Sequence, residues 1–181
     1  MIYKKTWKYI LIRDESYYCI KQGYYRPKAI KDFSNVKKND IGGYICGYYN
    51  LSQSGDCWIY DDVQIYDNAR ISENAKISGY AQVFRNAEVY GNAEVTGNSQ
   101  VFGNAQVYGN AKVSDNAQVF GNAKVYGNVC IHWKAQVYKD ARVFGNALVC
   151  GNAQVSGHAC IRDKSMIYGN ARVFDYAVIL M

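Results

Sequence analysis

The chain has 181 residues and a formal net charge of +6, which divides into +5 for residues 1–58 (ten Lys and Arg against five Asp and Glu) and +1 for residues 59–181 (11 against ten). A near-neutral C-terminal region excludes a mimic of nucleic acid, which needs rows of carboxylates. No apolar run approaches a membrane span, and Tyr9–Ile12 is too short for a signal peptide, so we predict a cytoplasmic protein, away from membranes, whose six cysteines are thiols.

Residues 1–58 are predicted to form a small β-rich leader. Its candidate strands are Trp7–Ile12, Tyr17–Lys21 and Tyr24–Ile30, followed by turn-rich sequence up to Trp58. The end of a repeat stack exposes backbone groups and core side chains, so it needs a cover. We predict that the leader is this N-terminal cap, with Trp58 either as a plug or as the first outward residue of the repeat. Its lysines are interpreted as a solvated surface, and nucleic acid is not expected as a partner.

Residues 59–181 repeat with a period of six. Every sixth residue from Ile59 to Ile179 is Val or Ile, at all 21 positions, and four places after each of the first 20 stands a small residue: 16 Ala, two Ser and two Val. Thirteen of the 20 corners between them carry Asn. Six residues suit one short strand and one corner, with Val or Ile and Ala pointing inward. Asn is expected to take the left-handed backbone of the corner, and the Gly before it to ease the bend. The unbroken hexad predicts a repeat architecture.

The residues that follow the inward positions sort into three columns, so the structural period is 18. One column is rich in small residues, and a second contains Tyr90, Tyr108, Tyr126 and Phe144. The third is Tyr66, Phe84, Phe102, Phe120, Tyr138, Ser156 and Phe174, and Gln precedes the inward residue at its first six places. Three hexads per turn predict a triangular prism of about seven coils, roughly 34 Å long at about 4.8 Å per coil.

This pattern resembles the hexapeptide repeat of left-handed parallel β-helices, and the resemblance alone implies the left-handed sense. Asp32-Phe33, Asp40–Ile45, Asn50–Gly55 and Trp58 also resemble the leader of bacterial and phage-encoded hexapeptide-repeat proteins that continues directly into Gly-Asn-Ala repeats. The resemblance covers about residues 24–181. It implies an all-β fold, a left-handed parallel β-helix (59–181) with a small N-terminal β-rich cap (1–58). Such proteins are loosely labelled transferase-like, and the resemblance implies no settled activity.

An acyl-CoA-dependent acyltransferase is the alternative function, because many such enzymes resemble this chain in their coils. Those enzymes extrude a loop from the coils and place a catalytic His near a trimer interface, whereas here 21 hexads run without a break. The candidate residues are His132, with Cys150 one coil away in its column, and His158, which replaces a corner Asn. No carboxylate is expected beside His132, and His158 is interpreted as structural. The sequence therefore favours a protein that is not an enzyme, with no cofactor and no metal.

Two sets of residues are predicted to contact proteins. Aromatic side chains in register would expose an apolar strip larger than soluble monomers usually show, and the apolar C-terminus has no cover, so we predict a homo-oligomer, either dimer or trimer. The predicted interface is Tyr66, Phe84, Phe102, Phe120, Tyr138, Phe174, Leu180 and Met181. The stretch that departs most from the consensus is either the product of sequence drift at a tolerant corner or a recognition spot for an unidentified protein partner. Its candidate residues are His132, Trp133, Lys134 and Lys139.

These features predict a non-catalytic β-helical scaffold that self-associates through a flat aromatic face and binds other proteins. Because the resembling family occurs in phage-related settings, the resemblance further implies a phage-encoded protein that binds and inhibits a host protein, such as a defence protein.

Overall fold

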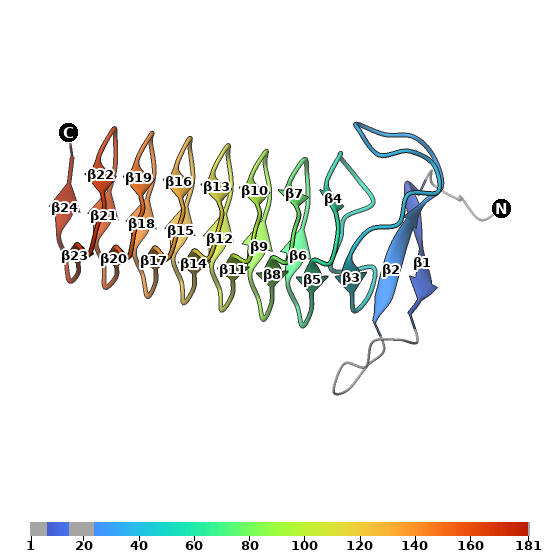
Figure 1. Ribbon diagram of the computed structural model, residues 1–181, viewed down its shortest axis with the longest axis horizontal. Coiled ribbons are helices and arrows are strands. Elements are labelled where there is room, and N and C mark those ends of the chain that lie inside the picture. The colour runs from blue at the N-terminus through green and yellow to red at the C-terminus, as the bar shows by residue number, and fades with distance from the viewer. Residues whose placement is uncertain (1–6, 15–23, 181) are drawn as a thin grey trace.

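The computed structural model describes residues 7–14 and 24–180, which form a long parallel β-solenoid with a pair of strands at its N-terminal end (Figure 1). The coils lie side by side along one axis, so the two ends of the chain lie at opposite ends of the molecule. Across the described residues there is no helix of the length and apolar character that a membrane crossing requires.

Three sheets of two-residue strands form the sides of the solenoid. Side A contains β3 (Tyr44–Ile45), β5 (Gln64–Ile65), β8 (Gln82–Val83), β11 (Gln100–Val101), β14 (Gln118–Val119), β17 (Gln136–Val137), β20 (Gln154–Val155) and β23 (Arg172–Val173). Side B contains β4 (Trp58–Ile59), β7 (Lys76–Ile77), β10 (Glu94–Val95), β13 (Lys112–Val113), β16 (Cys130–Ile131), β19 (Leu148–Val149) and β22 (Met166–Ile167). Side C contains β6 (Arg70–Ile71), β9 (Glu88–Val89), β12 (Gln106–Val107), β15 (Lys124–Val125), β18 (Arg142–Val143), β21 (Cys160–Ile161) and β24 (Val178–Ile179).

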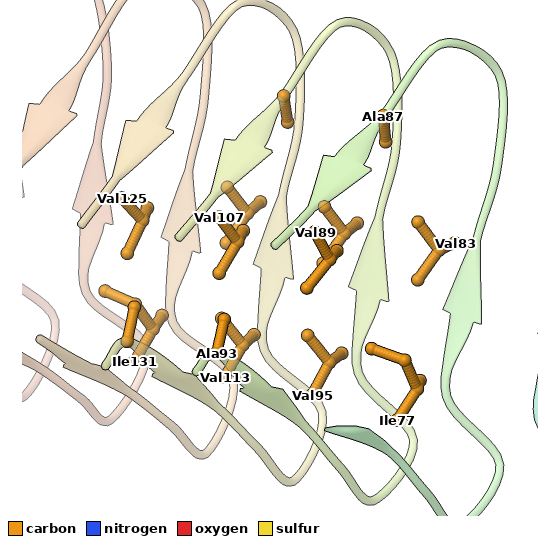
Figure 2. Packing of buried hydrophobic residues seen from close by; sticks show 14 of the residues in the cluster. Ile77, Val83, Ala87, Val89, Ala93, Val95, Val107, Val113, Val125 and Ile131 are labelled. Carbon is orange, nitrogen blue, oxygen red and sulfur yellow. The ribbon is translucent and has the colours of Figure 1, made fainter. Parts of the chain in front are cut away.

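The 18-residue period is confirmed by the register of the strands. Val101, for example, pairs in parallel with Val83 in the preceding coil and with Val119 in the following one. The inward Val and Ile side chains are fully buried from Ile59 to Ile161, except that Ile71 is 1% exposed, and they fill the interior together with the small residues (Figure 2). Each fully buried Val or Ile contributes roughly 1.5–3 kcal/mol before the entropy of ordering is subtracted. Coil stacking therefore supplies the core that no single coil could form.

The corners differ from the sequence prediction in which residue takes the left-handed backbone. Positive φ falls on the residue before the Asn: Gly103, for instance, has φ 78°, and Asp115 has φ 60° at the equivalent place. The Asn side chain instead joins one coil to the next, as where Asn104 Nδ2 donates to Asn122 Oδ1 at 3.0 Å. Glycine therefore meets the backbone requirement, and asparagine supplies a hydrogen bond along the stack.

The parallel stack begins upstream of residue 59. Strand β3 pairs in parallel with β5, and Leu51 bridges in parallel to Ile71, so side A has eight parallel strands and the solenoid about eight turns. The extra coil places Ile45 and Leu51 inward, both 0% exposed. It escapes a six-residue search because eight residues, not six, separate Leu51 from Ile59.

The rest of the leader covers the N-terminal end. Strands β1 (Tyr9–Arg13) and β2 (Tyr25–Ala29) are antiparallel, and β2 continues side A through its antiparallel contact with β3. The predicted strand Tyr17–Lys21 lies outside the described residues. Trp58 is 1% exposed and meets Tyr9 and Phe33 edge-on, with ring centroids 6.0 and 5.4 Å away. Because Trp58 pairs with Lys76 and precedes the inward Ile59, it is the first outward residue of side B, and the cap buries it.

Polar side chains hold this cap to the first coil. Gln53 accepts from Lys8 N at 2.9 Å through Oε1 and donates to Tyr9 O at 3.0 Å through Nε2. The ammonium of Lys8, 2% exposed, donates to Gly55 O, Cys57 O and Cys57 Sγ at 3.0, 2.8 and 3.3 Å. Burial lowers the pKa of Lys8 and raises the pKa of the Cys57 thiol. The cap therefore depends on a few buried polar contacts.

Replacing Gln53 with Ala is expected to lower the free energy of unfolding by about 1–3 kcal/mol, because the buried backbone of β1 loses its partners. Gln154→Ala is the matched control, since Gln154 only ends a side-chain ladder at 3.3 Å and should cost less than about 0.5 kcal/mol. Urea unfolding measures both, and equal losses would contradict the role of Gln53 as the clamp of the cap.

Candidate interaction surfaces

Side A carries a ladder of glutamine amides. Gln82, Gln100, Gln118, Gln136 and Gln154 each donate from Nε2 to Oε1 of the Gln one coil earlier, at 2.8–3.4 Å. The coil spacing produces this series, because outward side chains of equivalent residues lie directly above one another. Each amide that donates and accepts within the ladder still has one N–H and one lone pair directed elsewhere, so side A presents a fixed row of donors and acceptors.

A stack of aromatic rings runs parallel to the Gln ladder on side A. Neighbouring rings from Tyr66 through Phe84, Phe102 and Phe120 to Tyr138 lie 4.8–4.9 Å apart and within 6° of parallel. All five side chains are only partly exposed, since each ring covers the faces of its neighbours. The strip that these rings present to solvent therefore consists mainly of ring edges. Phe174, beyond the gap at Ser156, is 58% exposed.

Side A differs from the other two sides in its charge. From Gln64 to Ser156, the outward residues that flank its inward positions are Gln, Tyr, Phe and Ser, without a charged side chain. Side B has Lys76, Glu94 and Lys112 at equivalent places, with Lys112 Nζ 3.1 Å from Glu94 Oε2. Side C has five charged residues at such places: Arg70, Glu88, Lys124, Arg142 and Arg162. The distinguishing property of side A is thus neutrality over six coils.

A shallow hollow lies where side A meets the cap. Its volume is about 540 Å³, and its lining is Tyr44, Asp62, Gln64, Tyr80, Gln82, Asn98 and Gln100. Tyr80 is 66% exposed at the corner, and the amides of the Gln ladder form part of the lining. A second hollow, about 450 Å³, borders Trp7, Lys8 and Phe33 at the cap, but the ammonium of Lys8 is already satisfied by three acceptors.

The surroundings of His132 differ from the sequence prediction. Asp115 Oδ2 lies 3.8 Å from His132 Nδ1 and accepts from the backbone N–H of Trp133 at 2.9 Å. Trp133 is 59% exposed and packs edge-on against the His132 ring at 5.3 Å. Asp115 precedes Trp133 by 18 residues, so the two occupy equivalent corners of successive coils. A comparison of corner residues between coils, and not only of the residues equivalent to His132, would have predicted this contact.

The remaining candidates lie at different distances from this cluster along the stack. Cys150 is buried in the next coil of side B, and Lys134 is exposed at the same corner as Trp133. Lys139 follows β17, so it lies at the opposite edge of side A from Trp133, which precedes β17. His158 stacks on Tyr176 at 4.9 Å, as a corner residue. Among the described residues, no group of three His, Cys, Asp or Glu side chains could hold a metal ion.

The C-terminal end of the solenoid is open. In its last described coil Val173 and Ile179 are partly exposed and Ala171 is exposed, whereas their counterparts one coil earlier are buried. Leu180 is 54% exposed, and Met181 lies outside the described residues. Further apolar side chains that the sequence prediction did not include are exposed there as well: Met166, Tyr168, Tyr176 and Val178. The sequence could have indicated these residues, because they are apolar at outward positions that carry mostly polar residues in earlier coils.

Four segments of the chain match the family model described as a YdcK beta solenoid repeat: residues 63–79, 105–119, 135–151 and 167–180. No curated protein matches the chain. The matched segments lie within the stacked coils, and each contains inward Val or Ile residues of the repeat. The parallel three-sided stack makes the chain a β-solenoid, and its coils are similar to the repeats that this family model describes.

Proposed function

We propose that this solenoid is a non-catalytic scaffold that binds proteins through side A, and that its first partner is a second copy of itself. The observation that carries the proposal is the uncharged surface of Gln amides and ring edges between Gln64 and Ser156. Burying such a surface removes no charge from water, which is the most expensive desolvation in an interface. The fixed ladders also lose little side-chain entropy on binding.

The middle of side A is the best-presented part of this surface. Gly103 and Gly121 follow Phe102 and Phe120, so no side chain from those corners overhangs the rings. Towards the N-terminus, the Arg85 guanidinium lies 5.8 Å from the Phe102 ring. Lys139 is exposed at the corresponding corner on the C-terminal side. A partner would therefore meet a neutral central strip bordered by cations.

A second copy suits this strip because two neutral surfaces meet without like-charge repulsion. The ladder amides supply both donors and acceptors, so the same surface can hydrogen-bond to itself. An interface in which both partners use one patch is the usual arrangement of a two-fold dimer. Trimer formation around side A remains compatible with the same chemistry.

An outside protein partner would use the corner beside side A. Trp133 is exposed there, held by Asp115 and His132, and an anchored aromatic side chain is a typical interface hot spot. The proposal that such a partner is a host protein, inhibited by a phage-encoded chain, is supported by the family resemblance of the leader and repeats.

The acyltransferase alternative gains one observation, the Asp115 carboxylate beside His132. An acid that orients a His is part of the usual general-base arrangement. However, 3.8 Å is too long for a hydrogen bond, and neither histidine lines either hollow described above. This geometry favours the scaffold.

The double variant Phe102→Arg/Phe120→Arg is expected to lower the solution mass measured by light scattering, because it places two cations in the neutral strip. Tyr108→Arg/Tyr126→Arg is the matched control: it removes the same kind of ring stack, 4.9 Å apart, from side C. The control should retain the native mass. A native monomer, or an equal loss in both variants, would contradict self-association through side A.

A thermal-shift titration with acetyl-CoA is expected to give no saturable stabilisation. Saturable stabilisation that is lost in His132→Ala would instead favour the acyltransferase.

A further inference from the structure

The last coil presents unpaired strand edges on all three sides of the solenoid. In the body of the stack, backbone N–H groups donate to the next coil, as from Gln154 N to Ala171 O and from Ser156 N to Val173 O, both within 3.0 Å. One period later, Arg172 and Phe174 direct the same groups away from the stack, and no described residue pairs with them. Strands β22 and β24 end their sheets in the same way. Such edges are templates for pairing with another chain.

We propose that this end pairs with the same end of a second copy, through a two-fold axis that opposes Val173 with the partner's Val173. A two-fold axis across the solenoid reverses the direction in which the chain circulates, so all three edges meet antiparallel. Strand β23 would pair with the partner copy of β23, and β22 with the partner copy of β24. The surface lies beyond the neutral strip of side A between Gln64 and Ser156, so the two contacts can fail independently.

The sequence supports this register on every side of the coil. Ile167 and Ile179 lie six residues on either side of Val173, so one register opposes inward residues with inward residues throughout. The partly exposed Val173 and Ile179 would then be covered, as the equivalent residues are within the stack. A shift by one residue would oppose inward with outward side chains, which strongly disfavours it.

The outward residues also match in this register. Met166 falls opposite the partner's Leu180, and Tyr168 falls opposite the partner's Val178, so four exposed apolar side chains per end are covered in pairs; each is at least 54% exposed in the single chain. Arg172 falls opposite the partner's Phe174 and beside the partner's Asp175, which brings opposite charges together twice across the axis. Cross-strand pairs of this kind stabilise an antiparallel pairing.

The C-terminal end of a second copy is a better partner for this end than the N-terminal end of a second copy. At the N-terminal end, β2 already pairs with the backbone of β3, and β1 lies beyond β2 in antiparallel order. Head-to-tail stacking on side A would have to displace these two strands, whereas two C-terminal ends present three antiparallel-compatible edges to each other at once.

The register is tested with the full-length double variant Met166→Cys/Leu180→Cys under mild oxidation. Opposed residues of a hydrogen-bonded antiparallel pair have Cα atoms about 5.5 Å apart, within the range of a disulfide. The residues directly beneath them one coil earlier, Leu148 and Arg162, are not cysteines, and Cys150 and Cys160, two residues along in that coil, are replaced with Ser in every chain compared. Non-reducing electrophoresis should show a covalent dimer.

The single variants are the controls. The two-fold axis pairs Met166 with the partner's Leu180 and not with the partner's Met166, so a single introduced cysteine has no introduced cysteine opposite it. Met166→Cys alone and Leu180→Cys alone should give no more dimer than the native chain, whereas mixing them should restore it. The register is wrong if either single variant forms more covalent dimer than the native chain, or if the double variant forms no covalent dimer.

A second measurement separates this contact from side A. Met166→Asp should reduce the solution mass, whereas Leu148→Asp, at the equivalent outward position one coil earlier on side B, should not. The cross-link should persist in Phe102→Arg/Phe120→Arg. If only the side A variant loses mass, the end contact is overturned and the proposed function stands. If the native chain is a monomer and the Met166→Cys/Leu180→Cys variant forms no cross-link, both proposals are overturned.

Discussion

The hydrogen-bonded spacing between successive coils is the constraint on which the rest of this structure depends. Bonds such as Gln100 N to Ala117 O, at 2.9 Å, repeat every 18 residues and hold equivalent residues directly above one another. Any outward column of like residues must then form a ladder, because its members have no other neighbours so near. The amide series and the ring stacks of sides A and C, at 4.8–5.0 Å, are consequences of this one distance.

The same constraint makes the two ends of the solenoid chemically different from its body. Each interior coil satisfies the backbone of its neighbours, so only the first and last coils need another solution. At the N-terminal end, the side chains of Lys8, Gln53 and Asn50 supply hydrogen bonds that a further coil would have supplied. At the C-terminal end the chain offers apolar side chains and free strand edges instead, which is the chemistry of a contact with another chain.

Function in such a scaffold depends on what its sides carry, since all three sides share one backbone geometry. Sides B and C interleave charges of both signs, a pattern that keeps a surface solvated. Side A is neutral over six coils, and its side chains are fixed by their own ladders. The Trp133 corner adds one exposed aromatic anchor beside it. The molecule thus separates a neutral strip, an anchored corner and an open end, each suited to protein contact.

The sequence by itself determined the period, the inward residues and the columns, because a six-residue repeat leaves each side chain only one environment. It left Trp58 open between a plug and a first outward residue, and its pairing with Lys76 in the stack decided for the outward position. Tertiary structure decided the rest. The coil through Ile45 and Leu51 was hidden because its eight-residue spacing breaks the period, and Asp115 meets His132 only through stacking. The limited exposure of Phe102 likewise depends on rings from adjacent coils. Sequence periodicity fixes which residues share a column, but exposure and pairing depend on contacts between columns and coils, which follow from three-dimensional distances.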